Sequence, residues 1–219
     1  MKVLSLETSG RWGGFCLWDD GIVVEAIFEG REYSTLLASS LKEAVENSSW
    51  RWSGIELVVV SQGPGSFTGL RIGMSLGKGI SLVQKIPLIS IPTYEVIKRN
   101  FDLVEFPLLL LFPSRKGEVI LFEWERDKWV KEGEIVKIEK IPQFIEKEKI
   151  IAGEGVLLYR DWIEKKLKGK VLIPPFSYHI ARPSHLAVLG IERKKEAGWE
   201  KGISASPLYF REPRIGDKN

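Results

Sequence analysis

Residues 63–73 of this 219-residue chain, GPGSFTGLRIG, have the composition of an anion-binding loop. They follow an apolar run at 57–60 and lead into a long apolar segment with the spacing of a helix. A glycine-rich turn between a buried strand and a helix exposes N–H groups that can hold a phosphate. Nucleotide binding is therefore the first chemistry to test against the sequence.

The two standard nucleotide-binding patterns do not fit this stretch. A dinucleotide fingerprint requires a glycine three places after Gly65, where Thr68 stands. A Walker loop requires Gly-Lys followed by Ser or Thr, whereas Gly77-Lys78 is followed by Gly79 and lies inside the expected helix. The segment is not a standard phosphate cradle.

The helix expected at 68–84 carries a stripe of glycines. Gly69, Gly73 and Gly77 recur every four residues, so they share one face. Each glycine inside a helix costs roughly 0.8–1 kcal/mol relative to alanine, and such a stripe is tolerated where another backbone approaches closely. The other positions are apolar on almost every side, which predicts cover on more than one face. Two sources of the second cover remain open: the rest of this chain, or another protein.

Few other side chains have the types and spacing of a catalytic or metal site. The two histidines, His179 and His185, are six residues apart with Pro183 between them, so they do not share a helix face. A metal site needs several donors that converge. The single cysteine, Cys16, excludes an intramolecular disulfide, and neither His-Glu-x-x-His nor Gly-x-Ser-x-Gly occurs. We expect no metal and no cofactor in the isolated chain.

The order of the expected elements predicts an α/β fold of two lobes. In the first half we expect strands at 2–6, 14–18, 22–28, 57–60 and 88–91, with helices at 31–48 and 68–84. This strand–hairpin–helix–strand–helix order is that of the ribonuclease-H-like layered fold. In the second half we expect paired strands at 119–124 and 129–138, a short strand at 150–152, a turn at 153–155, and helices at 159–167 and 182–195. The predicted lobes are residues 1–103 and 104–219.

Composition predicts a globular protein of the cytosol. Hydrophobic residues make up 44% and charged residues 28%, which is ordinary for a folded domain. The longest apolar run, at 106–113, is too short for a bilayer, which needs roughly 20 residues, and the first residues lack a secretory signal. The net charge is +3, and the basic clusters at 165–168 and 193–195 are weak signs of RNA binding, because a solvated helix face looks the same.

Four stretches carry a family resemblance: LETS at 6–9, the glycine-rich 63–73, SRKGEV at 114–119 and PLYFR at 207–211. In this order they resemble the TsaB (YeaZ) family, the accessory subunit of the bacterial tRNA threonylcarbamoyladenosine machinery. The stretch 63–73 matches the family's signature, and in the last stretch Phe210 stands where the family has leucine. The resemblance is strong in the first lobe and loose from about 120 to 200.

The resemblance implies an actin/Hsp70-like fold with a reduced second lobe and a heterodimer with the catalytic relative TsaD. The contact would be a helix bundle built from the helices at 31–48 and 68–84. TsaE, an ATPase, joins the pair, and the complex transfers a threonylcarbamoyl group to the adenosine beside the anticodon of tRNA. Without TsaD, family members pair with themselves through the same surface. Contact with tRNA would come through the complex only, and a nucleotide at a shared interface remains open.

The resemblance also assigns residues to two groups. The predicted partner-binding residues are Tyr33, Leu36, Leu37, Leu41, Ala44, Leu70, Gly73, Met74, Gly77 and Ile80. The predicted signature loop comprises Gly63, Pro64, Gly65, Ser66, Phe67, Thr68, Gly69 and Arg71. Trp50 and Trp52, beside the end of the first helix, are candidates for the border of the docking surface.

The same resemblance implies a scaffold without catalytic residues of its own. The catalytic relative holds a metal through histidines on the first-lobe helix, and the matching helix here begins Arg31-Glu32-Tyr33. Two alternatives remain open. One is an actin-fold ATPase or phosphotransferase that uses Glu7, Thr8 and the loop at 63–69. The other is an RNA-binding module that acts through the basic clusters.

Overall fold

The computed structural model describes residues 1–30, 33–197 and 205–210, and its contacts divide the chain into two compact units. One unit is Met1–Thr93 with Pro183–Asn219, and the other is Tyr94–Arg182. The predicted lobes of 1–103 and 104–219 therefore differ from the observed units. The reason is that α6 (Pro183–Ala197) returns to pack on strands β1 and β2 of the first unit.

The first unit contains the predicted ribonuclease-H-like sheet. Its strands are β1 (Lys2–Glu7), β2 (Trp12–Asp19), β3 (Ile22–Glu29), β4 (Leu57–Gly63) and β5 (Leu88–Pro92), in the order β3-β2-β1-β4-β5. The first three strands run antiparallel, and β1, β4 and β5 run parallel. The hairpin between β2 and β3 turns at Asp20, whose φ of 53° suits a short polar residue.

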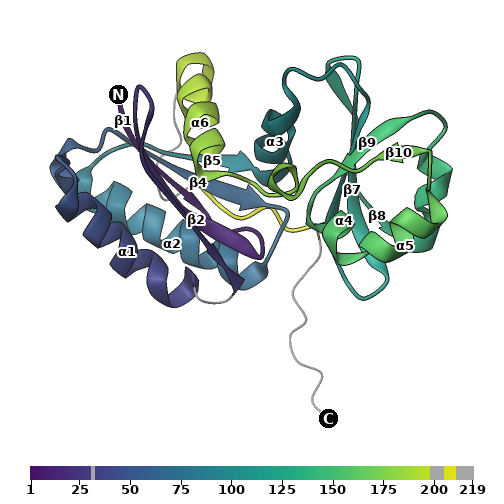
Figure 1. Cartoon of the computed structure of the whole chain (residues 1–219). Coiled ribbons are helices and arrows are strands. Elements are labelled where there is room, and N and C mark those ends of the chain that lie inside the picture. The colour runs from purple at the N-terminus through teal and green to yellow at the C-terminus, as the bar shows by residue number, and fades with distance from the viewer. Residues whose placement is uncertain (31–32, 198–204, 211–219) are drawn as a thin grey trace, which may run out of the picture. The chain divides into compact units, whose positions relative to one another are not determined.

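Helices cover both faces of this sheet (Figure 1). Helices α1 (Tyr33–Asn47) and α2 (Phe67–Gln84) lie on one face, and α6 lies on the other. Successive residues of a strand point to opposite faces: Val58 and Val60 face Gly77 of α2, whereas Val59 faces Gly190 of α6. Strand β4 is therefore buried on both sides, which explains its unbroken apolar sequence.

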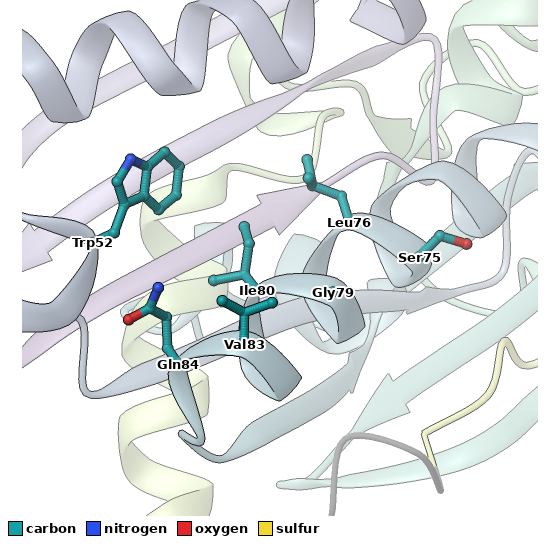
Figure 2. Close-up of a pocket in the computed structure, with 7 residues that line it drawn as sticks. All are labelled: Trp52, Ser75, Leu76, Gly79, Ile80, Val83 and Gln84. Atoms are coloured by element: carbon teal, nitrogen blue, oxygen red, sulfur yellow. The ribbon is translucent and has the colours of Figure 1, made fainter.

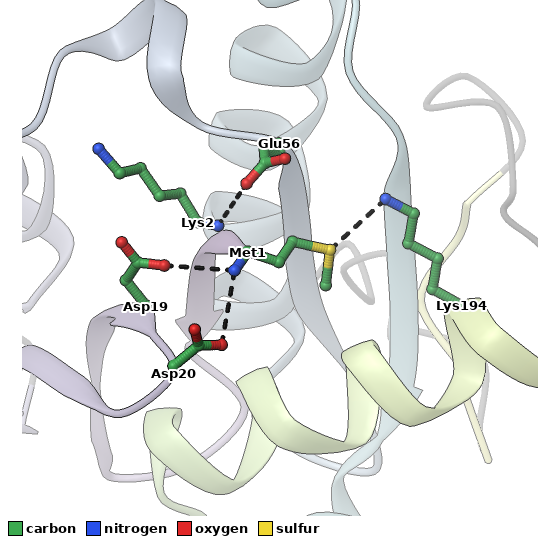
Figure 3. Close-up of polar contacts among 6 residues, drawn as sticks. All are labelled: Met1, Lys2, Asp19, Asp20, Glu56 and Lys194. Carbon is green, nitrogen blue, oxygen red and sulfur yellow. Dashed lines mark hydrogen bonds and ion pairs between the residues drawn. The ribbon is translucent and has the colours of Figure 1, made fainter.

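Polar contacts hold the end of the sheet at which β1 begins (Figure 3). The amino group of Met1 donates to Asp19 Oδ1 at 3.2 Å, and the backbone N–H of Lys2 donates to Glu56 Oε2 at 2.7 Å. The hydrogen bond to Asp19 raises the pKa of the Met1 amino group. The Nζ of Lys194 in α6 lies 3.7 Å from the sulfur of Met1. The first residue of the chain therefore contacts both the end of β2 and α6.

The second unit repeats the strand topology of the first, with shorter parallel strands and shorter helices. Its strands are β6 (Leu108–Pro113), β7 (Glu118–Glu125), β8 (Lys128–Lys137), β9 (Lys149–Ala152) and β10 (Val171–Leu172), in the order β10-β9-β6-β7-β8. Three antiparallel strands are again followed by two parallel ones. The sequence pattern predicted the β7–β8 pair but not β6, the central strand, which was noted only as an apolar run.

Short helices take the places that α1 and α2 hold in the first unit. A 3₁₀ helix, η4 (Ile138–Phe144), follows β8, and α4 (Glu154–Leu158) and α5 (Arg160–Lys166) lie between β9 and β10. Helix α4 begins where a turn was predicted. The remaining helices of the described residues are α3 (Thr93–Lys98), η2 (Trp52–Gly54), η3 (Arg99–Phe101) and η5 (Phe176–Tyr178). No helix in the described ranges combines the length and the apolar character needed to cross a membrane.

Candidate functional site

The turn between β4 and α2 is packed tightly against the chain itself. Ser66 caps α2 by accepting the N–H of Gly69 at 3.2 Å, and its own N–H donates to the carbonyl of Ser9 at 2.5 Å. A Cβ at Gly65 would lie 2.1 Å from that same carbonyl oxygen. Gly63 has a φ of +104°, a backbone conformation that favours glycine. The glycines of the signature loop thus serve close packing within the unit.

Glu7, the last residue of β1, and Thr8, which lies against Gly73 of α2, are enclosed near this turn. Both side chains are fully buried. The carboxylate of Glu7 accepts from the backbone N–H and the hydroxyl of Ser9, at 2.7 and 2.5 Å. The N–H of Thr8 donates to Ser61 Oγ at 3.1 Å. Neither residue lines the hollows described below.

The glycine stripe of α2 faces the chain's own sheet, which corrects a prediction. A Cβ at Gly73 would lie 2.2 Å from the hydroxyl oxygen of Thr8, and a Cβ at Gly77 would lie 2.5 Å from a methyl group of Val60. Both glycines are required because β1 and β4 approach the helix closely. As direct partner contacts, Gly73 and Gly77 were predicted wrongly.

Most of the other predicted partner-binding residues also belong to the monomer core. Those fully or almost fully buried are Leu37, Leu41, Leu70 and Met74. Leu37, Leu41 and Met74 join the apolar cluster between the sheet and the two helices. Leu36 is 41% exposed, while Ala44 and Ile80 are half-buried. Tyr33 begins α1, and its side chain lies outside the described part of the structure.

One side of the second half of α2 is apolar and only partly covered by the chain. Leu76, Gly79, Ile80 and Val83 follow one another at helical spacing, and we call them the outer face of α2. Leu76 and Ile80 are half-buried against the core, whereas Val83 is 76% exposed. A Cβ at Gly79 would meet nothing within 4 Å, so the packing within the monomer does not require a glycine there.

A hollow lies over the outer face of α2 (Figure 2). Its volume is about 340 Å³. Its lining residues are Trp52, Ser75, Leu76, Gly79, Ile80, Val83 and Gln84. The indole of Trp52 stands opposite Ile80 and Val83 across it, as Figure 2 shows. Trp52 therefore lines this hollow, whereas Trp50 is buried in the core.

A second hollow, of about 770 Å³, lies in the second unit and is mainly polar. Two ion pairs stand in its wall: Lys149 with Glu123, which is buried, and Lys147 with Glu125. Strands β7 and β9, which contribute Glu123 and Lys149, flank β6. Because these charges neutralise one another, they favour a structural role in joining the strands.

The two histidines occupy separate units. His179 is buried, and its ring nitrogens lie 3.3 Å from the carbonyl oxygen of Gly153 and 3.0 Å from that of Pro174. Burial lowers the pKa of His179. His185 lies in α6. In the described ranges, no group of three or more His, Cys, Asp or Glu side chains is placed to hold a metal ion.

Comparison with known proteins identifies the chain's relatives. The model of the family described as "TsaD: tRNA N6-adenosine threonylcarbamoyltransferase" matches residues 23–190. The "tRNA threonylcarbamoyladenosine biosynthesis protein TsaB" of Bacillus subtilis is 27% identical, over 96% of this chain and 94% of that protein. The Escherichia coli protein of the same name is also 27% identical, over 74% of this chain and 72% of its own length. The chain belongs to this family, and within it to the TsaB (YeaZ) proteins.

A solved TsaB-type structure supports the fold assignment. "YeaZ from Pseudomonas aeruginosa" superposes with a TM-score of 0.76 at 16% identity, over 95% of this chain and 99% of that one. The predicted α/β fold and the TsaB resemblance are therefore confirmed. Of the predicted partner-binding residues on α2, Ile80 belongs to the outer face, whereas Gly73 and Gly77 face the sheet. Exposed Gly79 was not among the predicted residues.

Proposed function

We propose that this chain is a non-catalytic scaffold that binds a TsaD-type transferase, joined by TsaE, for threonylcarbamoylation of the adenosine next to the anticodon in tRNA. The names of its relatives support the broader role in tRNA threonylcarbamoyladenosine biosynthesis. The observation that carries the docking proposal is the outer face of α2, an apolar stripe with a hollow that the described chain leaves open.

The chemistry of this face suits a helix of another protein. Large apolar side chains that stand out of a surface helix favour contact with a partner over contact with water. Gly79 lacks a side chain at the centre of the stripe, so a partner's side chain can approach the helix backbone there. Trp52 adds an aromatic wall, and aromatic residues are enriched where partners bind strongly.

The enclosure of Glu7 and Thr8 supports the scaffold over the ATPase or phosphotransferase alternative. Both would have to face a nucleotide, yet both side chains are fully buried, Thr8 lies against Gly73 of α2, and the carboxylate of Glu7 is hydrogen-bonded to Ser9. Opening that site would separate Gly73 from Thr8 and break the packing of α2 on the sheet. The proposal also includes contact with tRNA through the assembled complex only, and it allows a nucleotide at the interface shared with the partner. We also propose that the chain acts in the cytosol.

Reconstitution tests the proposal. The purified chain is combined with TsaD and TsaE from the same organism, tRNA, threonylcarbamoyl adenylate as the donor of the group, and ATP for TsaE, and modified adenosine is measured by mass spectrometry. We expect modification to need all three proteins and to fall at least about tenfold with Val83→Asp, because a charge then enters an apolar contact. Binding of TsaD, measured by calorimetry, should weaken in parallel.

Leu158→Asp is the matched control. Leu158 is also an exposed apolar residue, at 60%, but it lies in α4 of the second unit. This variant should retain both binding and activation. Modification that proceeds equally well without the chain, or a Val83→Asp variant that binds and activates normally, would contradict the proposal.

A further inference from the structure

The segment at residues 206–209, here called the strap, lies across the turn that leads into α2. The N–H of Leu208 donates to the carbonyl of Gln62 at 2.7 Å, and the side-chain amide of Gln62 donates to the carbonyl of Ser206 at 3.2 Å. A segment near one end of the sequence is thus hydrogen-bonded to the last residues of β4.

Two side chains of the glycine-rich motif hold the strap from α2. The ring of Tyr209 packs on that of Phe67 with centroids 4.7 Å apart. Arg71 donates from Nε to the hydroxyl of Tyr209 at 3.4 Å, and its guanidinium carbon lies 3.8 Å from the centre of the Phe67 ring. Neither Phe67 nor Arg71 lines the hollow over the outer face, so docking does not explain them.

Buried Ala205 anchors the start of the strap, and Gly63 packs closely against Leu208 in its middle. Ala205, which precedes it, is 1% exposed and belongs to the core between sheet and helices. A Cβ at Gly63 would lie 3.0 Å from the carbonyl oxygen of Leu208, so the glycine leaves room for the strap. Two stretches that are far apart in sequence, 63–71 and 206–209, therefore form one contact.

We propose that the strap is a positioning device for α2: it fixes the turn at 63–66 and the first turn of the helix in the arrangement that docks the partner. This inference rests on the proposed function. Three hydrogen bonds and one ring contact are few compared with the contacts of the sheet. The strap can therefore open while the sheet remains folded, as low-stability segments of proteins do. Release of the strap loosens the first turn of α2, which lies at the N-terminal end of the helix whose second half carries the outer face.

Hydrogen exchange of the full-length chain tests the positioning step without a partner. Tyr209→Ala removes the ring contact, and Leu208→Pro removes the N–H that donates to Gln62. With either variant we expect the amides of residues 63–72 to exchange about tenfold faster, while those of β1 and α6 exchange as before. Unchanged exchange at 63–72, or an equal increase throughout the chain, would overturn the proposal.

Tyr178→Ala is the matched control. Tyr178 and Tyr209 are both 39% exposed, and each packs against one phenylalanine. Tyr178 lies in the second unit, so its variant should leave the exchange of 63–72 unaltered.

Affinity for the partner is the second measurement. Tyr209→Ala should weaken binding of TsaD about tenfold, and Tyr178→Ala should not. Faster exchange with unchanged affinity would overturn the positioning role of the strap and leave the docking face intact. If instead the docking proposal is wrong, the Val83→Asp variant will bind TsaD normally, so the two failures can be told apart.

Discussion

The glycines of α2 differ in what their missing side chains make possible. At Gly73 and Gly77 a methyl group would collide with β1 and β4, whereas at Gly79 it would point into open space. Glycine therefore allows close packing within the monomer at Gly73 and Gly77, and at Gly79 it leaves the surface hollow open.

Alanine substitution separates these two roles by the sign of its effect. Gly79→Ala should raise the free energy of unfolding by up to about 1 kcal/mol, because alanine favours the helix. That corresponds to an increase in Tm of about 2–4 °C for a chain of this size. Gly73→Ala should lower Tm, because its methyl group would lie 2.2 Å from the hydroxyl oxygen of Thr8. Circular dichroism during heating measures both, and shifts of the same sign would contradict the assignment.

At the scale of elements, buried His179 links the end of η5 to the turn between β9 and α4. Its ring lies between the carbonyls of Gly153 and Pro174. A neutral imidazole has one N–H and donates to only one of them at a time. Gly153 has a φ of +96° and packs against Leu111, so the turn that the ring touches is itself rigid.

The lowered pKa of His179 predicts acid sensitivity. Above the ordinary value of 6.5 the ring is neutral in both the folded and the unfolded chain. As the pH falls below 6.5, the unfolded chain binds a proton before the folded chain does, so the free energy of unfolding decreases. His179→Gln removes the titrating group and should flatten this dependence. Urea unfolding at pH 7.5, 6.5 and 5.5 measures it, and parallel curves for the two proteins would refute the prediction.

Considered as a whole, the molecule has one topology used twice. Each unit has a sheet of three antiparallel strands extended by two parallel ones. Only in the first unit are the connections long helices, of 15 and 18 residues. The surface proposed for docking is therefore a property of the first unit, where α2 is long enough to bury one face and expose the other.

This arrangement predicts that the isolated chain pairs with itself through the outer face of α2. A face that combines protruding Val83 with the hollow over Gly79 is complementary to a second copy related by a two-fold axis. Light scattering over a range of concentrations should show a dimer that Val83→Asp converts to a monomer. Leu158→Asp should remain dimeric. A chain that is monomeric at every concentration, or a Val83→Asp variant that stays dimeric, would count against this surface.

The sequence alone determined the first sheet and its two long helices. Alternating apolar residues, the Asp19-Asp20-Gly21 hairpin and the helical spacing at 31–48 and 68–84 are local signals, because each arises from neighbours within a few residues. The motif at 63–73 indicated the family for the same reason. The central strand β6 was missed because a short apolar run fits a buried strand and a buried helix equally well.

Only the tertiary structure decided which side of α2 is covered by the chain. A stripe of glycines records that something approaches closely, but it does not record whether that is β1 and β4 or another protein. The return of α6 to the first unit and the contact between Tyr209 and Phe67 were likewise beyond the sequence. Such contacts join residues more than a hundred positions apart, and no periodicity of a single segment encodes its distant partner.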